Sequence, residues 1–190
     1  MGKLVYSMSV SLDGFVETPD RSLDWVLIDE ELHSFFNDEA REMSAFLYGR
    51  RLYELMVKSW PTAATDHAAT PAMVEFARIW KDKPKIVFSR TLERVEWNSR
   101  LVRTDAVEEV ARLKALPGFD MSVGGPTTAS PLIRAGLIDE YRLFVHPVIL
   151  GAGAPYFPAP EGRLGLKLLE TRTFTSGVVY LRYEAISPAG

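Results

Sequence analysis

Residues 122–128 read Ser-Val-Gly-Gly-Pro-Thr-Thr, which indicates a strand, two glycines and the start of a helix in that order. Pro126 suits the first position of a helix, where its missing N–H costs no hydrogen bond. Gly124 and Gly125 let a ligand approach the backbone, and the free N–H groups at the helix start would face an anion such as phosphate. An ordinary tight turn before a capped helix explains the same residues equally well.

Two other predicted strand ends carry groups that suit phosphate. Gly49, Arg50 and Arg51 follow a short apolar run and begin a predicted helix, where an arginine is unfavourable to the helix dipole unless an anion lies nearby. Ser89 and Arg90 follow another apolar run. Because ligands of open parallel sheets bind at the carboxyl ends of the strands, we expect the three strand ends to surround one anion. Solvated surface arginines are the alternative interpretation.

Strand-like and helix-like patterns alternate along the chain on both sides of these motifs. Short apolar runs predict strands, and apolar residues at three- and four-residue spacing predict helices. The expected strands cover residues 3–9, 45–48, 85–88, 120–123 and 140–149, and the expected helices cover 30–44 and 51–57 and begin near residues 71, 106 and 126. Two closing strands, 166–173 and 178–186, flank Ser176-Gly177 as a hairpin. This order predicts an α/β fold with a mostly parallel central sheet, helices on both faces and a C-terminal antiparallel hairpin.

Composition narrows the class of protein. The chain has 190 residues, of which 47% are hydrophobic and 25% charged, and this favours one folded domain over residues 1–190. The net charge of −3 lacks the basic excess of a nucleic-acid binder. The absence of cysteine excludes disulfides, and His33, His67 and His146 lack metal-ligand spacing, so we expect no metal. No membrane span or signal peptide is evident, and we expect a cytoplasmic protein.

Asp13 is the first candidate for acid–base chemistry, because it follows the first predicted strand directly. Asp13-Gly14 is also a common turn pair, and the turn has most of the weight. Trp25 is placed near the pocket as an aromatic neighbour, although a tryptophan that anchors a loop is the more common outcome. The acidic residues of the first helix are interpreted as mostly a solvated face: Glu30, Glu31, Asp38, Glu39 and Glu42.

Seven short motifs, in this order, resemble the dihydrofolate reductase-like superfamily, and most closely its branch containing the reductase domain of riboflavin biosynthesis. The resemblance covers about Lys3 to Ile186, and the ordered set is more specific for the family than for a substrate. The motifs are Ser11-Leu12-Asp13-Gly14, Tyr48-Gly49-Arg50, Phe88-Ser89-Arg90-Thr91-Leu92, Gly124-Gly125-Pro126, Leu132-Ile133-Arg134-Ala135-Gly136-Leu137-Ile138-Asp139-Glu140, Pro147-Val148-Ile149-Leu150-Gly151-Ala152-Gly153 and Tyr156-Phe157.

The resemblance implies a domain that binds NADPH and donates a hydride. It also implies a homodimer, and a Gly124–Gly125 peptide bond that is often cis in the family. By the same resemblance, Gly49, Arg50 and Arg51 would face the cofactor phosphates, and Ser89 and Arg90 would lie beside the adenosine 2′-phosphate. Gly124 and Gly125 would lie near the nicotinamide, with Pro126, Thr127 and Thr128 on the pyrophosphate. Ser9 and Val10 would lie beside the nicotinamide ring.

Two substrate signatures of the family are missing. His33 stands near the position where dihydrofolate reductases carry an acid, and Val123 stands where riboflavin-pathway reductases usually carry Glu before the glycine pair. The sequence therefore keeps the cofactor half of the resemblance and favours neither known substrate.

The primary hypothesis is an NADPH-dependent reductase of a small pterin- or pyrimidine-like heterocycle. Asp13 would deliver the proton, directly or through water, and Trp25, Phe36 and Tyr156 would form an aromatic wall over the substrate. The alternative is a nucleotide- or flavin-binding module without turnover, and a dimeric scaffold is a third, weaker reading.

Overall fold

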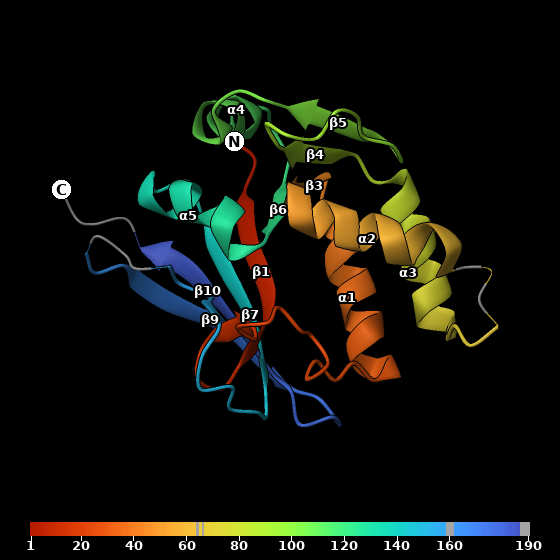
Figure 1. Ribbon diagram of the computed structural model, residues 1–190. Helices are drawn as coiled ribbons and strands as arrows, with labels where there is room; N and C mark the ends of the chain where they lie inside the picture. Colours follow the sequence, from red (N-terminus) through yellow and green to blue (C-terminus); the bar gives the residue numbers. More distant parts are fainter. Residues whose placement is uncertain (64, 66, 159–161, 187–190) are drawn as a thin grey trace.

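The computed structural model describes residues 1–63, 65, 67–158 and 162–186, and its centre is one eight-stranded sheet (Figure 1). Pairing across the sheet is parallel except at the C-terminal hairpin, whose second strand runs antiparallel to both of its neighbours. In spatial order the strands are β5 (Ser99–Val102), β4 (Lys85–Phe88), β3 (Ala45–Gly49), β6 (Met121–Gly124), β1 (Leu4–Ser11), β7 (Glu140–His146), β10 (Val179–Ile186) and β9 (Gly165–Thr173). A separate two-stranded sheet joins β2 (Phe15–Glu17) to β8 (Ala154–Pro155).

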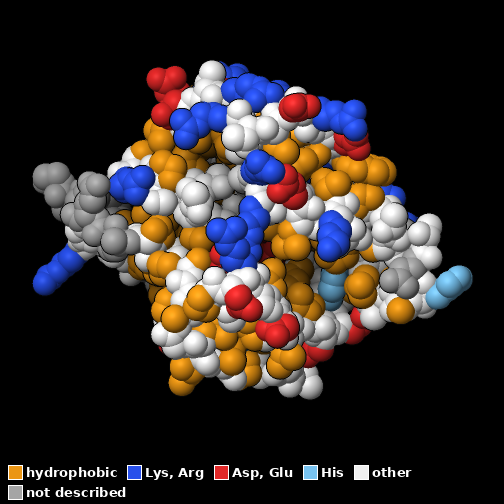
Figure 2. All heavy atoms as spheres, viewed as in Figure 1, with side chains coloured by type: hydrophobic (Ala, Val, Ile, Leu, Met, Phe, Trp, Pro, Cys, Tyr) orange, Lys and Arg blue, Asp and Glu red, His pale blue; other side chains and the backbone are white. Residues whose placement is uncertain are grey.

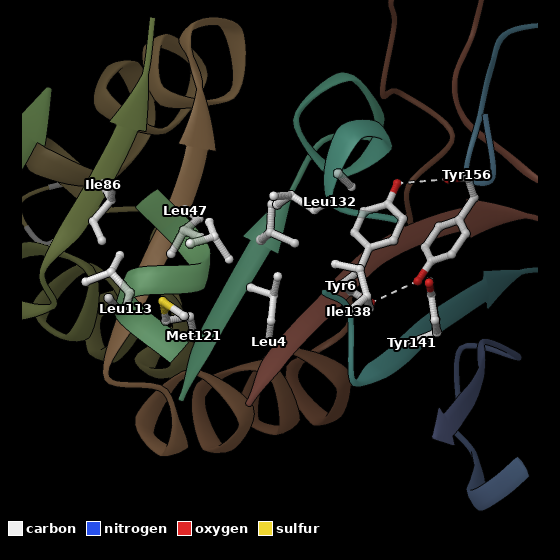
Figure 3. Packing of buried hydrophobic residues seen from close by; sticks show 14 of the residues in the cluster. Leu4, Tyr6, Leu47, Ile86, Leu113, Met121, Leu132, Ile138, Tyr141 and Tyr156 are labelled. Carbon is white, nitrogen blue, oxygen red and sulfur yellow. Dashed lines mark hydrogen bonds between the residues drawn. The ribbon is translucent and has the colours of Figure 1, made fainter. Parts of the chain in front are cut away.

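Helices cover both faces of the sheet, as the sequence predicts. One face carries α1 (Glu30–Glu42), α2 (Arg50–Ala63) and α3 (Pro71–Asp82), and the other carries α4 (Ala106–Lys114) and α5 (Pro126–Arg134) (Figure 1). Alternation along β1 explains the two cores, because Val5 packs with the first set of helices. Leu4 and Tyr6 point to the opposite core with Leu132 of α5 (Figure 3).

Side-chain caps fix the start of three helices and leave a fourth open. Asp29 accepts from the Leu32 N–H at 2.8 Å, Thr70 caps α3 before Pro71, and Asp105 caps α4. The N-cap residue of helix α5 is Gly125, which has φ 89° and provides no side-chain hydrogen bond. The first N–H groups of α5 are therefore available to a ligand.

The structure differs from the sequence predictions at one sheet-edge strand and at the ends of β7 and α2, and the short strands β2 and β8 were not predicted either. Strand β5 was not predicted, because its Ser-Arg-Leu-Val sequence at the sheet edge is too short and polar to show an apolar run. Strand β7 ends at His146, since Pro147 has no N–H for the ladder. Helix α2 extends to Ala63, well past the predicted end at residue 57. Within the described residues, no helix has the length and apolar content that a bilayer crossing needs.

Candidate functional site

A cleft of about 490 Å³ opens at the carboxyl ends of β3 and β6, where the helices α2 and α5 begin. We call it the helix-end cleft. It brings together eight of the predicted cofactor residues, from two segments of the chain that are far apart in sequence. They are Gly49, Arg50, Arg51, Gly124, Gly125, Pro126, Thr127 and Thr128.

The helix-end cleft is suited to an anion. Two helix N-termini meet there, and neither helix has an acidic residue in its first turn. Unpaired N–H groups and the positive ends of both helix dipoles favour negative charge at this point. The positive charges of Arg50 and Arg51 add to the same field.

Two glycines permit the close packing that shapes this cleft. A Cβ at position 49 would overlap the Thr128 hydroxyl oxygen, and a Cβ at position 124 would approach Leu52 Cδ2 to 2.5 Å. Gly125 needs its positive φ of 89°, which a residue with a side chain rarely adopts. The Gly124–Gly125 peptide bond is trans, like the other peptide bonds of the described residues.

Both arginines are about half exposed and each pairs with a carboxylate at the cleft. Arg51 donates to Glu17 Oε1 at 2.6 Å and to the Arg21 carbonyl at 3.3 Å. Arg50 pairs with Glu54 at 2.8 Å on its own helix. The exposed pair of Arg50 with Glu54 contributes only about 0–1 kcal/mol, so an incoming phosphate can replace it at little cost.

The third predicted strand end lies beside the first two. Ser89 and Arg90 line a polar groove of about 460 Å³, which shares Phe88 with the helix-end cleft. Arg50 reaches this loop through a 3.0 Å hydrogen bond to Thr91 Oγ1. The polar groove and the helix-end cleft therefore border each other at Phe88, so the three strand ends lie close together. Figure 2 shows several Lys and Arg side chains along the upper edge of the molecule, near α4 and β5.

A second cavity, of about 260 Å³, lies between the face of β1 and the helices α1 and α2. Its walls are mostly aromatic and aliphatic, and we call it the aromatic pocket. Ser9 and Phe36 line it, and their places beside the nicotinamide and the substrate stay predictions. Met8, Leu52 and Gly124 line both the aromatic pocket and the helix-end cleft. The two cavities therefore share a border, at which the Gly125 N–H points to Met8 Sδ at 3.2 Å.

A charged pair at one wall of the aromatic pocket was missed by the sequence analysis. Glu39 is not part of a solvated face: only 19% of its side chain is exposed, and it lines the pocket. Arg142, on β7, donates to Glu39 Oε2 and to Glu140 Oε2, the latter at 2.8 Å. Burial raises the pKa of the Glu39 carboxyl, although Arg142 opposes this shift.

Glu140 is the anchor of this charged network. Burial alone would raise its pKa, but bonds from Arg182, Lys3 and Arg142 outweigh burial and lower the pKa to about 2. Lys3 and Arg182 approach its carboxylate at 2.9 Å. The network carries two cations besides Arg142, so Glu140 stays ionised throughout the physiological range.

His33 lines the same pocket. The sequence analysis noted only that it stands near the position where dihydrofolate reductases carry an acid. It is 8% exposed and lies edge-on to Phe36, Trp60 and Phe76, with ring centroids 6.4, 5.8 and 5.9 Å away. Its Nδ1 is buried and has no hydrogen-bond partner among the described residues. A buried polar atom of this kind is normally satisfied by water or a ligand.

Tyr156 does not form part of an aromatic wall over a substrate, which corrects the sequence prediction. Its side chain is 1% exposed and stacks on Tyr6 with ring centroids 4.3 Å apart (Figure 3). The two tyrosines exchange hydrogen bonds, from Tyr6 to the Tyr156 carbonyl at 3.1 Å and from Tyr156 to the Tyr6 carbonyl at 2.9 Å. Tyr156 is therefore a core residue.

Val10 and Trp25 also lie outside both cavities. Val10 is 1% exposed and belongs to the core under α4 and α5. Trp25 packs edge-on against His146, with centroids 5.4 Å apart, and anchors the segment that leads into α1. His146 accepts the Leu27 N–H on Nδ1 at 3.3 Å in the same place.

Asp13 does not line any of the three cavities described above, so the structure does not support its predicted role as proton donor. Its carboxylate accepts from the Leu150 N–H at 3.1 Å, the Gly151 N–H at 2.7 Å and the Ser11 hydroxyl at 2.7 Å. The Ser11 bond is the main reason that its pKa lies below the usual range. Asp13 is thus an ionised carboxylate that ties the β1–β2 turn to the loop after β7. Among the described residues, no group of three His, Cys, Asp or Glu side chains is placed to hold a metal ion.

Comparisons with known proteins agree with this geometry. The family model described as the RibD C-terminal domain matches residues 2–180. The uncharacterized protein YyaP of Bacillus subtilis (strain 168) is 34% identical over 182 residues, which is 95% of this chain and 94% of that protein.

Two solved structures have a similar fold over nearly the whole chain. The Thermotoga maritima diaminohydroxyphosphoribosylaminopyrimidine deaminase/5-amino-6-(5-phosphoribosylamino)uracil reductase has a TM-score of 0.65 at 15% identity, over 97% of this chain and 57% of that chain. Dihydrofolate reductase from Enterococcus faecalis, complexed with NADP(H), has a TM-score of 0.65 at 15% identity, over 98% of each chain. At these identities the likeness shows the fold alone. The chain belongs to the RibD C-terminal domain family and has the dihydrofolate reductase-like α/β fold.

Proposed function

We propose that the protein is an NADPH-dependent reductase of a small pterin- or pyrimidine-like heterocycle. The observation that carries the proposal is the border between the two cavities at Met8, Leu52 and Gly124. A dinucleotide in the helix-end cleft would end at this border, against a ring held in the aromatic pocket. The bound NADP(H) of the Enterococcus faecalis dihydrofolate reductase supports this choice of cofactor.

NADPH, when bound, supplies a hydride that adds to the carbon of a C=N bond while a proton from water adds to the nitrogen, giving NADP⁺ and the reduced ring. The protein's part is to bind and orient. Thr127 and Thr128 would hold the pyrophosphate at the start of α5, and Arg50, Ser89 and Arg90 would hold the 2′-phosphate. Holding two rings in contact replaces a bimolecular encounter, which is the largest contribution expected from such a site.

The test is to supply the purified protein with NADPH and a panel of oxidised pterins and pyrimidines, and to follow loss of the reduced nicotinamide's absorbance. Loss that depends on one ring compound would support a reductase. Tight NADPH binding with no loss across the panel would favour the alternative, a nucleotide-binding module without turnover.

A homodimer is also part of the proposal, and β9 is the surface that we assign to it. This nine-residue edge strand has eight exposed residues, among them Leu168 at 50% and Leu169 at 42% exposure. Natural edge strands are usually short or protected, so a long apolar edge suggests pairing. The pairing of β9 with β10 shifts register between Leu168 and Glu170, so Lys167 and Glu170 lie on one face of the strand although they are three residues apart. An antiparallel second copy would therefore set Lys167 against the partner's Glu170, and the reverse pair would form by symmetry.

A further inference from the structure

The aromatic pocket contains one arginine and no lysine, and that arginine is already neutralised. Arg142 is 4% exposed in its side chain and lies between the carboxylates of Glu39 and Glu140. A phosphate could bind Arg142 only by displacing a buried carboxylate, which would leave that carboxylate charged, buried and unpaired. Such an exchange is strongly unfavourable. The helix-end cleft differs, because both of its arginines are about half exposed and Arg50 pairs with an exposed carboxylate, Glu54.

Two polar side chains that line the pocket, Glu39 and His33, suit a neutral ring instead. Glu39 Oε2 accepts from both Arg142 and Tyr180, whereas Glu39 Oε1 has no donor among the described residues. His33 Nδ1 is buried without a partner. A carboxylate oxygen takes an N–H donor, and an imidazole nitrogen can accept or donate one hydrogen bond. Both residues belong to α1 and line the same cavity.

Size and shape restrict the ligand further. At about 260 Å³, the cavity is below the usual range of pockets for drug-sized ligands, roughly 300–1,000 Å³. Phe36, Trp60, Phe76 and Phe144 supply flat apolar walls. A single or fused ring fits such a space, and a sugar-phosphate tail would have to lie outside it.

We infer that the substrate is an uncharged, unphosphorylated nitrogen heterocycle whose N–H donor binds Glu39 Oε1 and whose second polar edge atom binds His33. This inference rests on the proposed function and narrows its substrate class. It separates the chain from the Thermotoga maritima reductase, whose name specifies a phosphoribosylamino substrate.

The experiment is calorimetric titration of the protein, saturated with NADP⁺ so that no turnover occurs, with two probes that differ by the phosphoribosyl group. One probe is 5,6-diaminouracil, and the other is 5-amino-6-(5-phosphoribosylamino)uracil. We expect the bare ring to bind at least about tenfold more tightly, because the pocket has no room for the sugar and no free cation for the phosphate. Equal or tighter binding of the phosphorylated probe would overturn the inference, and so would a pocket that binds neither.

Variants assign the effect to the two residues. Glu39→Gln should weaken 5,6-diaminouracil about tenfold through loss of a charge-assisted hydrogen bond. The substitution should also reduce the ratio between the affinities for 5,6-diaminouracil and for the phosphorylated probe, because Arg142 would then be neutralised by one carboxylate fewer. Glu42→Gln is the matched control, since Glu42 lies on the same helix, 4.0 Å from Arg142 and 65% exposed, and it should change neither affinity.

His33→Asn is the second variant, and it should lower the affinity for 5,6-diaminouracil without altering the affinity for NADPH. An effect of Glu42→Gln equal to that of Glu39→Gln would contradict the assignment. The two proposals fail separately, because NADPH affinity is measured in its own titration. If the wild type does not bind NADPH, the proposed function is contradicted. If it binds NADPH but binds the phosphorylated probe as tightly as 5,6-diaminouracil or more tightly, only this inference is contradicted.

Discussion

Gly49 lies so close to Thr128 that any side chain at position 49 would overlap the Thr128 hydroxyl oxygen. This contact sets the starts of α2 and α5 against each other and so shapes the helix-end cleft. Gly49→Ala should lower the free energy of unfolding by about 1–3 kcal/mol through overpacking, and it should weaken NADPH binding.

Removing the hydroxyl tests the cause of that loss. The double variant Gly49→Ala/Thr128→Ala should recover most of the stability, as measured by urea unfolding of the two single variants and the double variant. Strictly additive losses would show that the two residues are not coupled.

The arginines near the Ser89–Arg90 loop should distinguish the two nicotinamide cofactors. Arg50→Ala and Arg90→Ala should each weaken NADPH about tenfold or more in a binding titration, with little effect on NADH, because only NADPH carries the 2′-phosphate. Arg94→Ala is the control, since Arg94 is 86% exposed and outside the described cavities. Equal losses for both cofactors would remove the arginines from 2′-phosphate recognition.

Asp13→Asn should leave the hydride-transfer step nearly unchanged. Its carboxylate contacts backbone N–H groups of the loop after β7 rather than either cavity. The expected cost is a modest loss of thermal stability as that loop loosens. A collapse of the single-turnover rate with NADPH affinity and folding intact would restore Asp13 as a catalytic residue.

His146 should make the protein sensitive to acid. Burial lowers its pKa to about 4 from an ordinary value of 6.5, so the folded state binds a proton less readily than the unfolded state. Its contribution to stability is therefore complete well above pH 6.5 and is lost as the pH falls towards 4, by about 3 kcal/mol in all.

Comparison of two histidine variants isolates this contribution. His146→Gln should flatten the dependence of unfolding free energy on pH between these limits, whereas His67→Gln, at an exposed loop position, should not. Identical pH profiles for wild type and His146→Gln would refute the assignment to His146.

The β9 edge predicts the response of the oligomeric state to a single charge. Leu168→Glu places a carboxylate in the middle of the proposed pairing surface and should convert a dimer to a monomer in light scattering. Leu168 is 50% exposed in one chain, so the stability of the monomer should hardly change. A wild-type chain that is monomeric at high concentration would contradict the dimer.

The helix-end cleft was predictable because its signals are local. Gly49, Arg50 and the Gly124-Gly125-Pro126 turn each announce a strand end and a helix start within a few residues. The parallel sheet then brings the strand ends to one edge, since that is where carboxyl ends of parallel strands meet. Strand β5 was not predicted, because an edge strand needs no continuous apolar run.

The aromatic pocket was harder to predict because its polar residues come from distant segments. Glu39 and Arg142 are 103 residues apart, and neither position shows in sequence that the other will neutralise it. Periodicity groups Arg142 with Phe144 on one side of β7 but does not say that α1 covers that side. Tyr156 was misassigned for a related reason, since only the fold reveals its mutual hydrogen bonds with Tyr6.

The most direct test of the account is calorimetric titration of the purified protein with NADPH and, separately, with NADH. The account predicts one site per chain, with NADPH bound at least about tenfold more tightly than NADH, because charge-assisted bonds to the 2′-phosphate add to a shared pyrophosphate site. Binding of neither cofactor would contradict the reductase proposal and leave this family fold with a different use.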